Sequence, residues 1–159
     1  MKIKVKIRRL RAYDGFKVDL PMAYGDWFDL QAYEDTIMMK NGSYMVSLGV
    51  AMELPEGFEA LVVPRSSLFS KYGVLLVNSV GVIDNKYHGN SDVWKAPLLC
   101  IGDNVELKRG TRVCQFKIVL SQHATVWQKL RWLFCSGVEF EDVDVLTGEN
   151  RRGFGSTGE

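Results

Sequence analysis

The stretch VSLGVAMELPEGFEALVVPRSS, residues 46–67, decides the fold class. Apolar side chains fall at every second position from Val46 to Leu54, which is the period of a β-strand with one buried face. The turn residues PEG follow at 55–57, and FEALVV at 58–63 predicts the next strand. The stretch therefore predicts short strands that are joined by tight turns.

The same pattern continues on both sides of this stretch. GVLLVNSVGVI at 73–83 is β-rich with glycine punctuation, and VELKRGTRVCQFKIV at 105–119 predicts a further strand pair. Ile3, Val5 and Ile7 alternate with lysines, which predicts an edge strand with a lysine-rich outer face. A nucleic-acid-binding arm is the alternative interpretation of this basic start. Short strands at this spacing predict an all-β sandwich or barrel.

Length and composition narrow the class of protein. The 159 residues fit one domain, and the formal net charge of +1 gives no global positive field that would bind nucleic acid. Cys100, Cys114 and Cys135 lie in apolar stretches without CxxC spacing, so we expect core thiols in a reducing compartment. We see no signal-peptide pattern and no apolar run near the ~18 residues of a membrane span, so we expect a cytoplasmic location without membrane association.

One segment departs from the strand pattern. HATVWQKLRWLF, residues 123–134, predicts an amphipathic helix, and we expect a helical insertion at 123–135. Its apolar stripe consists of Val126, Leu130, Leu133 and Phe134. Packing of this stripe on the barrel is one interpretation, and a partner-binding helix with exposed tryptophans is the other.

Five further stretches carry residues suited to chemistry: GDWFDLQA at 25–32, PRSSL at 64–68, NSVGVIDNKYHG at 78–89, RGTRVCQF at 109–116 and RRGFGSTG at 151–158. Each has an ordinary explanation when taken alone, and Asp84 would then make an Asx turn in a hairpin. In this order, however, they resemble the five motifs of the trimeric deoxyuridine triphosphatases. GDWFDL at 25–30 and LGVAMELPEGFEALVVPRSS at 48–67 most resemble the branch of this family in Gram-positive bacteria and their phages.

The resemblance implies a fold, an assembly and a reaction. The fold would be a jelly-roll-like β-barrel over residues 1–148, followed by a mobile arm at 149–159 that closes over the substrate. The reaction would be hydrolysis of dUTP to dUMP and pyrophosphate, which keeps uracil out of DNA and supplies dUMP for thymidylate synthesis. The assembly would be a homotrimer whose sites take Ser66 and Gln115 from one chain, Asp84 and Tyr87 from a second, and the arm from the third.

The resemblance also implies roles for individual residues. Asp84 would activate the water that attacks the α-phosphorus, and Arg65 would bond to a carboxylate or a phosphate. The ring of Tyr87 would pack on the deoxyribose and exclude a 2′-hydroxyl. Mg²⁺ would be held mostly by phosphates and water, with Asp29 in the outer shell. The substrate-binding residues would be Ser66, Ser67, Asn78, Gly81, Ile83, Tyr87, Gln115, Arg151, Phe154, Gly155, Ser156 and Thr157.

Two alternatives accompany this interpretation. A dCTP deaminase shares the fold, but its glutamate ten residues beyond the motif aspartate is replaced here by Trp94, which argues against deamination. An active dUTPase that also binds a regulatory protein through Trp127 to Phe134 is the second. The chain departs from the common motifs at Lys86, His88 and Asn90, and Arg152 could take the place of Arg151.

Overall fold

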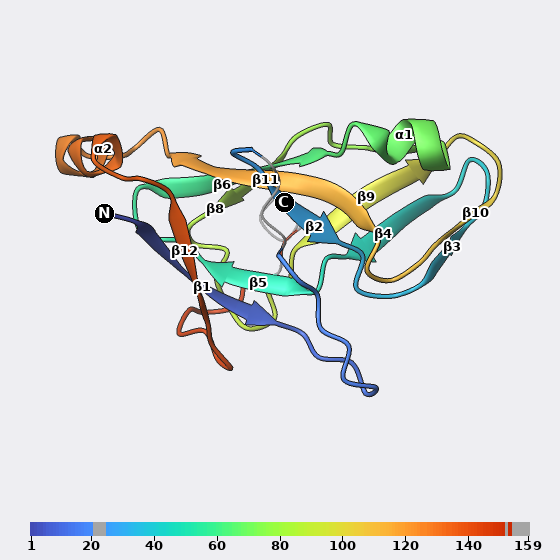
Figure 1. The fold of residues 1–159 in the computed structure, drawn as a ribbon, viewed down its shortest axis with the longest axis horizontal. Coiled ribbons are helices and arrows are strands. Elements are labelled where there is room, and N and C mark those ends of the chain that lie inside the picture. Colours follow the sequence, from blue (N-terminus) through green and yellow to red (C-terminus); the bar gives the residue numbers. More distant parts are fainter. Residues whose placement is uncertain (21–24, 152, 154–159) are drawn as a thin grey trace.

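The computed structural model describes residues 1–20, 25–151 and 153. Within these ranges the chain forms twelve strands and two short helices, so the all-β prediction is confirmed. Figure 1 shows β6 (Phe58–Pro64), β8 (Gly81–Asp84) and β11 (Arg112–Leu120) in a layer above β1 (Ile3–Arg9), β5 (Val50–Glu53) and β12 (Val138–Asp142). The predicted arm residues Phe154, Gly155, Ser156 and Thr157, together with Arg152, lie outside the described residues.

One sheet has the strand order β2-β11-β6-β8, with β2 at Phe28–Gln31, and it carries the predicted site residues Asp29, Gly81, Ile83, Asp84 and Gln115. All its pairs are antiparallel. Along β6 the burial alternates, as the period-two pattern predicts, so one face packs on the core. The register sets Gln115 opposite Asp29 and Glu59 opposite Asp84.

The N-terminal strand has the predicted buried face, but it does not lie at the predicted edge of a sheet. Ile3, Val5 and Ile7 are buried, as the alternation with lysines predicts. However, β1 is no edge strand, because it lies between β5, which is antiparallel to it, and β12, which is parallel. The register sets Lys4 opposite Glu139 and Lys6 opposite Glu141, so acidic residues of β12 lie beside the lysines of β1.

The stretch at 46–54 is two strands rather than one. β4 (Ser43–Ser47) pairs with β9 (Lys95–Cys100), which also pairs with β7 (Val74–Leu76), whereas β5 belongs to the sheet of β1. Gly49 makes the corner between them with φ +66°, and a Cβ there would lie 2.8 Å from the Tyr33 ring. The alternation runs through this corner, which hides the change of sheet from the sequence pattern.

The strand pair predicted at 105–119 is also rearranged. β10 (Val105–Leu107) pairs with β3 (Thr36–Met38), and β11 pairs with β2 and β6 instead. Both strands exist, but they do not form a hairpin with each other.

Aromatic rings pack in the core between the strands. Phe116 of β11 contacts Trp94 with 5.2 Å between ring centroids, and Phe140 of β12 contacts Phe28 with 4.9 Å between ring centroids.

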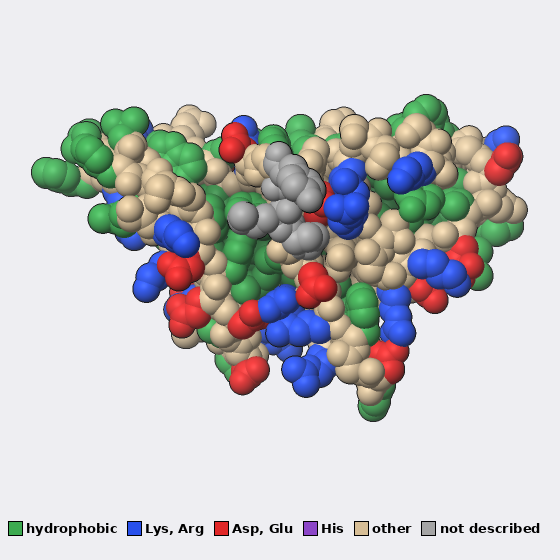
Figure 2. Space-filling model, in the orientation of Figure 1, with side chains coloured by type: hydrophobic (Ala, Val, Ile, Leu, Met, Phe, Trp, Pro, Cys, Tyr) green, Lys and Arg blue, Asp and Glu red, His purple; other side chains and the backbone are tan. Residues whose placement is uncertain are grey.

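Helix α1 (Ser67–Tyr72) follows β6, and α2 (Val126–Leu133) lies within the segment 123–135 for which a helix was predicted. The prediction that the apolar stripe of α2 packs on the barrel is wrong. Val126, Leu130, Leu133 and Phe134 are all exposed, and Trp127 is 80% exposed. Figure 1 shows α2 at the end of the molecule opposite α1, and Figure 2 shows hydrophobic side chains gathered there.

The reason is the way in which α2 is fastened to the barrel. A capping box between Thr125 and Gln128 starts the helix, and the Gln128 amide donates to the carbonyl of Glu56 at 3.1 Å. Four residues on, Trp132 packs on Phe58 with 5.6 Å between ring centroids. Because residues four apart share a helix face, Gln128 and Trp132 turn their own face to the barrel and leave the apolar stripe outside.

The helices also bear on membrane association. Neither of the two helices described combines the length and the apolar character that a membrane crossing requires.

The cysteines lead to a prediction about thiol chemistry. Cys100 and Cys114 are buried, and burial raises the pKa of the Cys114 thiol to about 12, whereas Cys135 is only half-buried. Since the thiolate is the reactive form, only about one Cys114 thiol in ten thousand is ionised at pH 8. We expect a thiol reagent to label Cys135 first in the native protein. Labelling should be followed by peptide mass spectrometry, and labelling of Cys114 at the rate seen in urea would contradict the core placement.

Candidate active site

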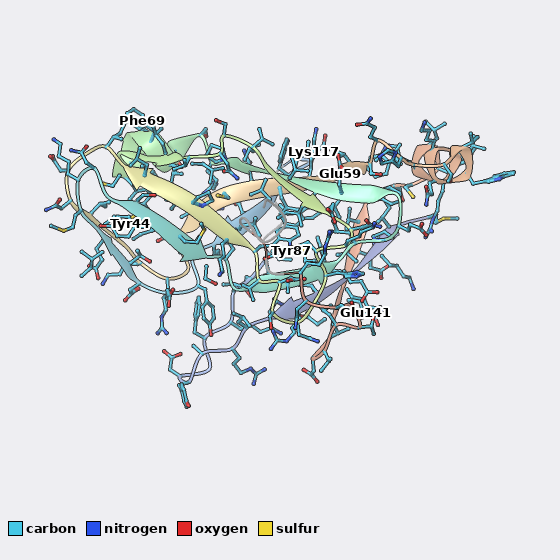
Figure 3. All side chains as sticks on the ribbon, turned by 180° about the vertical axis from the view of Figure 1, so that it is seen from behind. Tyr44, Glu59, Phe69, Tyr87, Lys117 and Glu141 are labelled. Atoms are coloured by element: carbon cyan, nitrogen blue, oxygen red, sulfur yellow. The ribbon has the colours of Figure 1, made fainter. Side chains whose placement is uncertain are left out.

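A cavity of about 380 Å³ opens beside β8. Six of the predicted site residues line it: Asn78, Gly81, Ile83, Asp84, Tyr87 and Arg151. Leu48, Val62, Trp94 and Pro97 add apolar walls, and Lys95 adds a cation. Figure 3 places Tyr87 near the middle of the molecule, below Glu59 of β6 and far from Phe69 of α1. The cavity thus combines apolar walls with a few polar groups, as small-molecule sites do.

Asp84 ends β8, and the turn after it fixes its carboxylate. The backbone N–H of Lys86 donates to Oδ1 of Asp84 at 2.7 Å, and the N–H of Tyr87 donates to the Asp84 carbonyl at 3.1 Å. The Asx turn that explains Asp84 structurally is therefore present. It uses one carboxylate oxygen only, and the other, Oδ2, lies 3.5 Å from Nη1 of Arg151. The side chain stays 55% exposed, so water reaches it.

Tyr87 forms a wall of the cavity. Its hydroxyl lies 3.4 Å from the carbonyl oxygen of Val93, to which it donates. Burial of the phenol, together with the nearby Asp92 carboxylate, raises the pKa of Tyr87 above its ordinary value. A Cβ at Gly153 would lie 3.0 Å from the Tyr87 ring, so the terminal segment passes close over the ring where a glycine stands.

Trp94 stands at the position where deamination would need a glutamate. It is 1% exposed and its ring packs on Phe116. Its indole N–H has no hydrogen-bond partner in the part of the chain that the structure describes. The position therefore supplies an apolar surface and not a carboxylate.

A second group of predicted residues lies around Asp29, which is 2% exposed. Nε of Arg65 lies 3.0 Å from one carboxylate oxygen of Asp29, and Nη1 of Arg112 lies 3.0 Å from the other. The buried carboxylate thus joins β2, the end of β6 and the start of β11. Arg112 was missed by sequence reasoning, although its place at the start of a strand within RGTRV could have suggested it.

Asp29 and a magnesium ion do not fit each other well in this geometry. Both carboxylate oxygens face guanidinium groups, and so little exposure leaves no room for a hydrated ion. Across the described ranges, the structure also shows no group of three or more His, Cys, Asp or Glu residues that could hold a metal. Asp29 acts here as the partner of two arginines.

Ser66 and Ser67 mark the passage from β6 into α1. Ser66 is the N-cap residue, yet its side chain makes no capping hydrogen bond and is exposed. The N–H of Leu68 donates to the Arg65 carbonyl at 3.0 Å, which closes a tight turn around the two serines. The Ser66 hydroxyl therefore remains available to an incoming group.

The structure keeps these two groups of residues apart. Arg65, Ser66, Ser67 and Gln115 do not line the cavity that holds Asp84. Asp84 pairs with Glu59, six positions before Arg65 on β6, which corresponds to about 20 Å along a strand. One chain therefore does not assemble all the predicted residues into one site. Arg151, in contrast, lies beside Asp84 of its own chain, where the trimer hypothesis expected an arm from another chain.

Asp92, which sequence reasoning missed, lies near Tyr87 and bonds to the backbone of Arg151. It is a buried carboxylate that accepts hydrogen bonds from the backbone N–H groups of Gly89 and Arg151. Nothing in NSDV distinguishes it from an ordinary surface loop.

Comparison with known proteins gives a consistent picture. The chain is 44% identical to the SPbeta prophage-derived deoxyuridine 5′-triphosphate nucleotidohydrolase YosS of Bacillus subtilis, over 86% of this chain and 87% of that protein. The fold is similar to the crystal structure of dUTPase from Streptococcus mutans, with a TM-score of 0.66, 25% identity, and 76% and 98% of the two chains covered. It also resembles the dUTPase of Staphylococcus bacteriophage 80alpha, with a TM-score of 0.61, 16% identity, and 77% and 93% covered.

These likenesses agree with the motifs in the sequence and with the cavity beside β8. The model of the dUTPase family matches residues 25–158, which include all five motif stretches. The chain therefore belongs to the dUTPase family.

Proposed function

We propose that the chain hydrolyses dUTP to dUMP and pyrophosphate. The observation that carries the proposal is the Asp84 carboxylate, which is fixed by its own turn on the wall of the cavity, with one oxygen facing Arg151. The activity would keep uracil out of DNA and supply dUMP for thymidylate synthesis. The three free cysteines fit a reducing cytoplasm as its location.

The chemistry needs a base, an in-line water and neutralisation of charge. Asp84 would take a proton from water through Oδ2 while the water oxygen bonds to the α-phosphorus. The bond between that phosphorus and the α,β-bridging oxygen would break, and its electron pair would leave with pyrophosphate. Arg151, which faces the same oxygen, would turn to the phosphates and offset the charge of the leaving group.

Selectivity would come from the walls of the cavity. In the described residues β8 pairs with β6 on one side only, so its second backbone edge can hydrogen-bond to uracil at Gly81 and Ile83. Asn78 adds a side-chain amide on the same wall. The ring of Tyr87 would pack on the deoxyribose and leave no room for a 2′-hydroxyl. Uracil and deoxyribose would thus be recognised by one hairpin.

The triphosphate would be bound by a neighbouring chain of a homotrimer. Ser66 and Ser67 would contact phosphate oxygens, Gln115 would approach the α-phosphate, and Arg65 would be oriented by Asp29. Exposed Leu75, Val77, Val80 and Val82 lie next to the Asp84 hairpin along the chain, as a subunit contact would require. Mg²⁺ would enter with the nucleotide, bound mainly to phosphate oxygens and water.

The terminal arm at 149–159 would complete the site. Arg151 is the described residue of the arm that reaches the cavity wall through its guanidinium. The predicted contacts of Phe154, Gly155, Ser156 and Thr157 with the substrate remain part of the proposal.

The first prediction concerns the base. Asp84→Asn keeps an oxygen for the turn but removes the proton acceptor, so kcat for dUTP should fall by about 10²–10⁴-fold. Asp103→Asn, which changes a fully exposed carboxylate before β10, serves as the matched control and should keep wild-type kcat. Pyrophosphate release with dUTP, dCTP, dTTP and UTP measures both activity and selectivity. An Asp84→Asn enzyme with more than a tenth of wild-type kcat would remove Asp84 from this role.

The second prediction concerns the shared site. Chains with Asp84→Asn and chains with Ser66→Ala are unfolded, mixed in equal amounts and refolded. If each site takes these two residues from different chains, about a quarter of the sites carry neither change in a randomly mixed trimer. Activity should then rise well above that of either variant alone. Mixed trimers confirmed by native mass spectrometry but without any gain would mean that both residues serve the site from one chain.

A protein-binding role is the second candidate function, and the exposed apolar face of α2 favours it. Val126, Trp127, Leu130, Leu133 and Phe134 are all exposed, and the barrel does not cover them. Phage dUTPases, among them that of Staphylococcus bacteriophage 80alpha, control transfer of virulence genes. A regulatory protein that contacts α2 would also lie near the Asp84 hairpin, because Thr125 and Gln128 share a cavity with Asp84 and Lys86.

Photo-crosslinking tests this second role. A photoactivatable phenylalanine analogue at position 127, in cells that express the chain, should give a specific protein adduct that a Leu130→Glu change abolishes. The same analogue at position 103 controls for random collisions. Identical adducts from the two positions would leave hydrolysis as the sole function of the proposal.

A further inference from the structure

The basic run RRLR at 8–11, where β1 ends, lines a second cavity of about 540 Å³, here called the basic cavity. Lys17 joins it from the hairpin after β1, which Figure 1 shows projecting from the end of that strand. Among the described residues, none that lines the basic cavity also lines the cavity beside β8. Four of the lining side chains are cations and two are carboxylates, so positive charges exceed negative ones by two.

The lysines of β1 do not share this excess. Lys6 pairs with Glu53 at 2.9 Å, and Lys4 lies opposite Glu139 of β12. Acidic residues therefore accompany the strand along its length, and the excess of positive charge begins where the strand ends.

Arg9 and Asp142 compensate each other at the wall of the basic cavity. Nε of Arg9 donates to Oδ1 of Asp142 at 2.7 Å, and Nη2 of Arg9 donates to Oδ2. This bidentate pair lowers the pKa of Asp142 and raises the pKa of Arg9, so both side chains stay charged. Lys17 shares the same carboxylate, since its Nζ lies 3.3 Å from Oδ1. One carboxylate thus serves two cations.

Arg8 is held in place by backbone carbonyls and not by a carboxylate. Its Nε donates to the carbonyl of Asp144 at 3.1 Å, and its Nη1 donates to the carbonyl of Asn90 at 3.0 Å. The ion pairs within the described residues include neither Arg8 nor Arg11. The two carbonyls orient the guanidinium of Arg8 but leave its charge uncompensated. Such a group, with N–H donors to spare, suits a phosphate oxygen.

Arg11 and Lys17 stand opposite each other across the hairpin. The two residues form an antiparallel bridge, and the next pair inward is closed by the Ala12 N–H, which donates to the Phe16 carbonyl at 2.9 Å. Directly opposed residues of an antiparallel pair have Cβ atoms about 4.5–5.5 Å apart on one face, and like charges there are destabilising. An anion between the two side chains would remove this repulsion.

We propose that the basic cavity binds a small anion that carries two or more phosphate groups. Arg8 binds one phosphate group through its oriented guanidinium, and Arg11 together with Lys17 binds another. The volume lies within the range of small-molecule sites. The site takes no part in the hydrolysis of dUTP, so it goes beyond the proposed function and does not depend on it.

The carboxylates around the basic cavity favour a small anion over a nucleic acid. Asp142 and Asp144 line the cavity, and Oδ1 of Asp19 lies 3.8 Å from Nη1 of Arg9. A chain of phosphates that extends beyond the cavity meets these carboxylates and is repelled by them. A compact anion can contact the cations and stay clear of the carboxylates.

Lysine footprinting tests the site in the nucleotide-free wild-type protein, with pyrophosphate as the probe. Acetic anhydride acetylates accessible amines, and peptide mass spectrometry gives the rate at each lysine. At about 10 mM, which is tenfold above a millimolar Kd, pyrophosphate should slow the acetylation of Lys17 by about tenfold. Lys2, an exposed lysine that does not line the cavity, should react at an unchanged rate.

Two comparisons give this footprint its meaning. Sodium chloride at the same ionic strength shows how much of the effect is screening. Pyrophosphate that binds only in the cavity beside β8 leaves Lys17 unprotected, because the two cavities share no described residue. A rate at Lys17 that is the same with pyrophosphate as with sodium chloride would overturn the proposal.

A substitution tests whether the cations act together. Arg11→Gln removes an exposed charge and leaves the backbone bridge to Lys17 in place, and it should raise the Kd of pyrophosphate, measured from the protection of Lys17, by about tenfold or more. Arg131→Gln, on the exposed surface of α2, changes the net charge equally and should not. Circular dichroism checks that both variants fold. An equal effect of the two substitutions would show that only net charge matters, and the proposed site would be refuted.

A further arm of the experiment separates a small anion from a nucleic acid. Single-stranded oligothymidylate at the same concentration of phosphate groups should protect Lys17 less than pyrophosphate does, because the carboxylates repel the rest of the strand. Protection by the oligonucleotide that equals or exceeds that by pyrophosphate would assign the cavity to nucleic acid and overturn the proposal. None of these measurements needs turnover, so a protein that fails to hydrolyse dUTP would still show whether the basic cavity binds the anion.

Discussion

The pairing of β6 with β11 is the constraint on which the rest of the structure depends. Seven consecutive residue pairs, from Cys114 opposite Pro64 to Leu120 opposite Phe58, lock the two strands in register. Each strand then presents its other edge, β11 to β2 and β6 to β8. The buried Asp29 and the Asp84 hairpin consequently stand on opposite sides of the same pair, at distant points along it. A slip of one strand by one residue would turn that strand's core residues outward.

This constraint explains which parts of the fold could be predicted from the sequence. Alternation identifies strands, because burial of every second residue is a local property. It does not identify neighbours, so β1 was expected at an edge and 46–54 was expected to be one strand. The corner at Gly49 preserves the alternation while it changes the sheet. For α2 the apolar periodicity correctly predicted a helix. The face that meets the barrel is set by Gln128 and Trp132, and neither residue belongs to the apolar stripe.

The candidate site shows the same limit at the level of side chains. Motif residues such as Asp84, Asn78 and Tyr87 could be identified because their order along the chain is distinctive, and they share one cavity. Asp92 could not, since its importance arises only when the segment at 146–151 returns to the loop at 89–92. Arg112 is similar, because its partner Asp29 is distant in sequence. Groups that act by contact with remote backbone leave no local pattern.

The parallel pairing of β1 with β12 has a consequence for biosynthesis. Ile3 lies opposite Val138, which comes far later along the chain, so the sheet around β1 cannot be completed until β12 has left the ribosome. Contacts of such sequence separation form late and slow the folding of β-rich domains. Until then β1 can pair only with β5, and its other edge stays open to neighbouring nascent chains. Rapid synthesis of β12 after β1 would thus protect the nascent chain from aggregation.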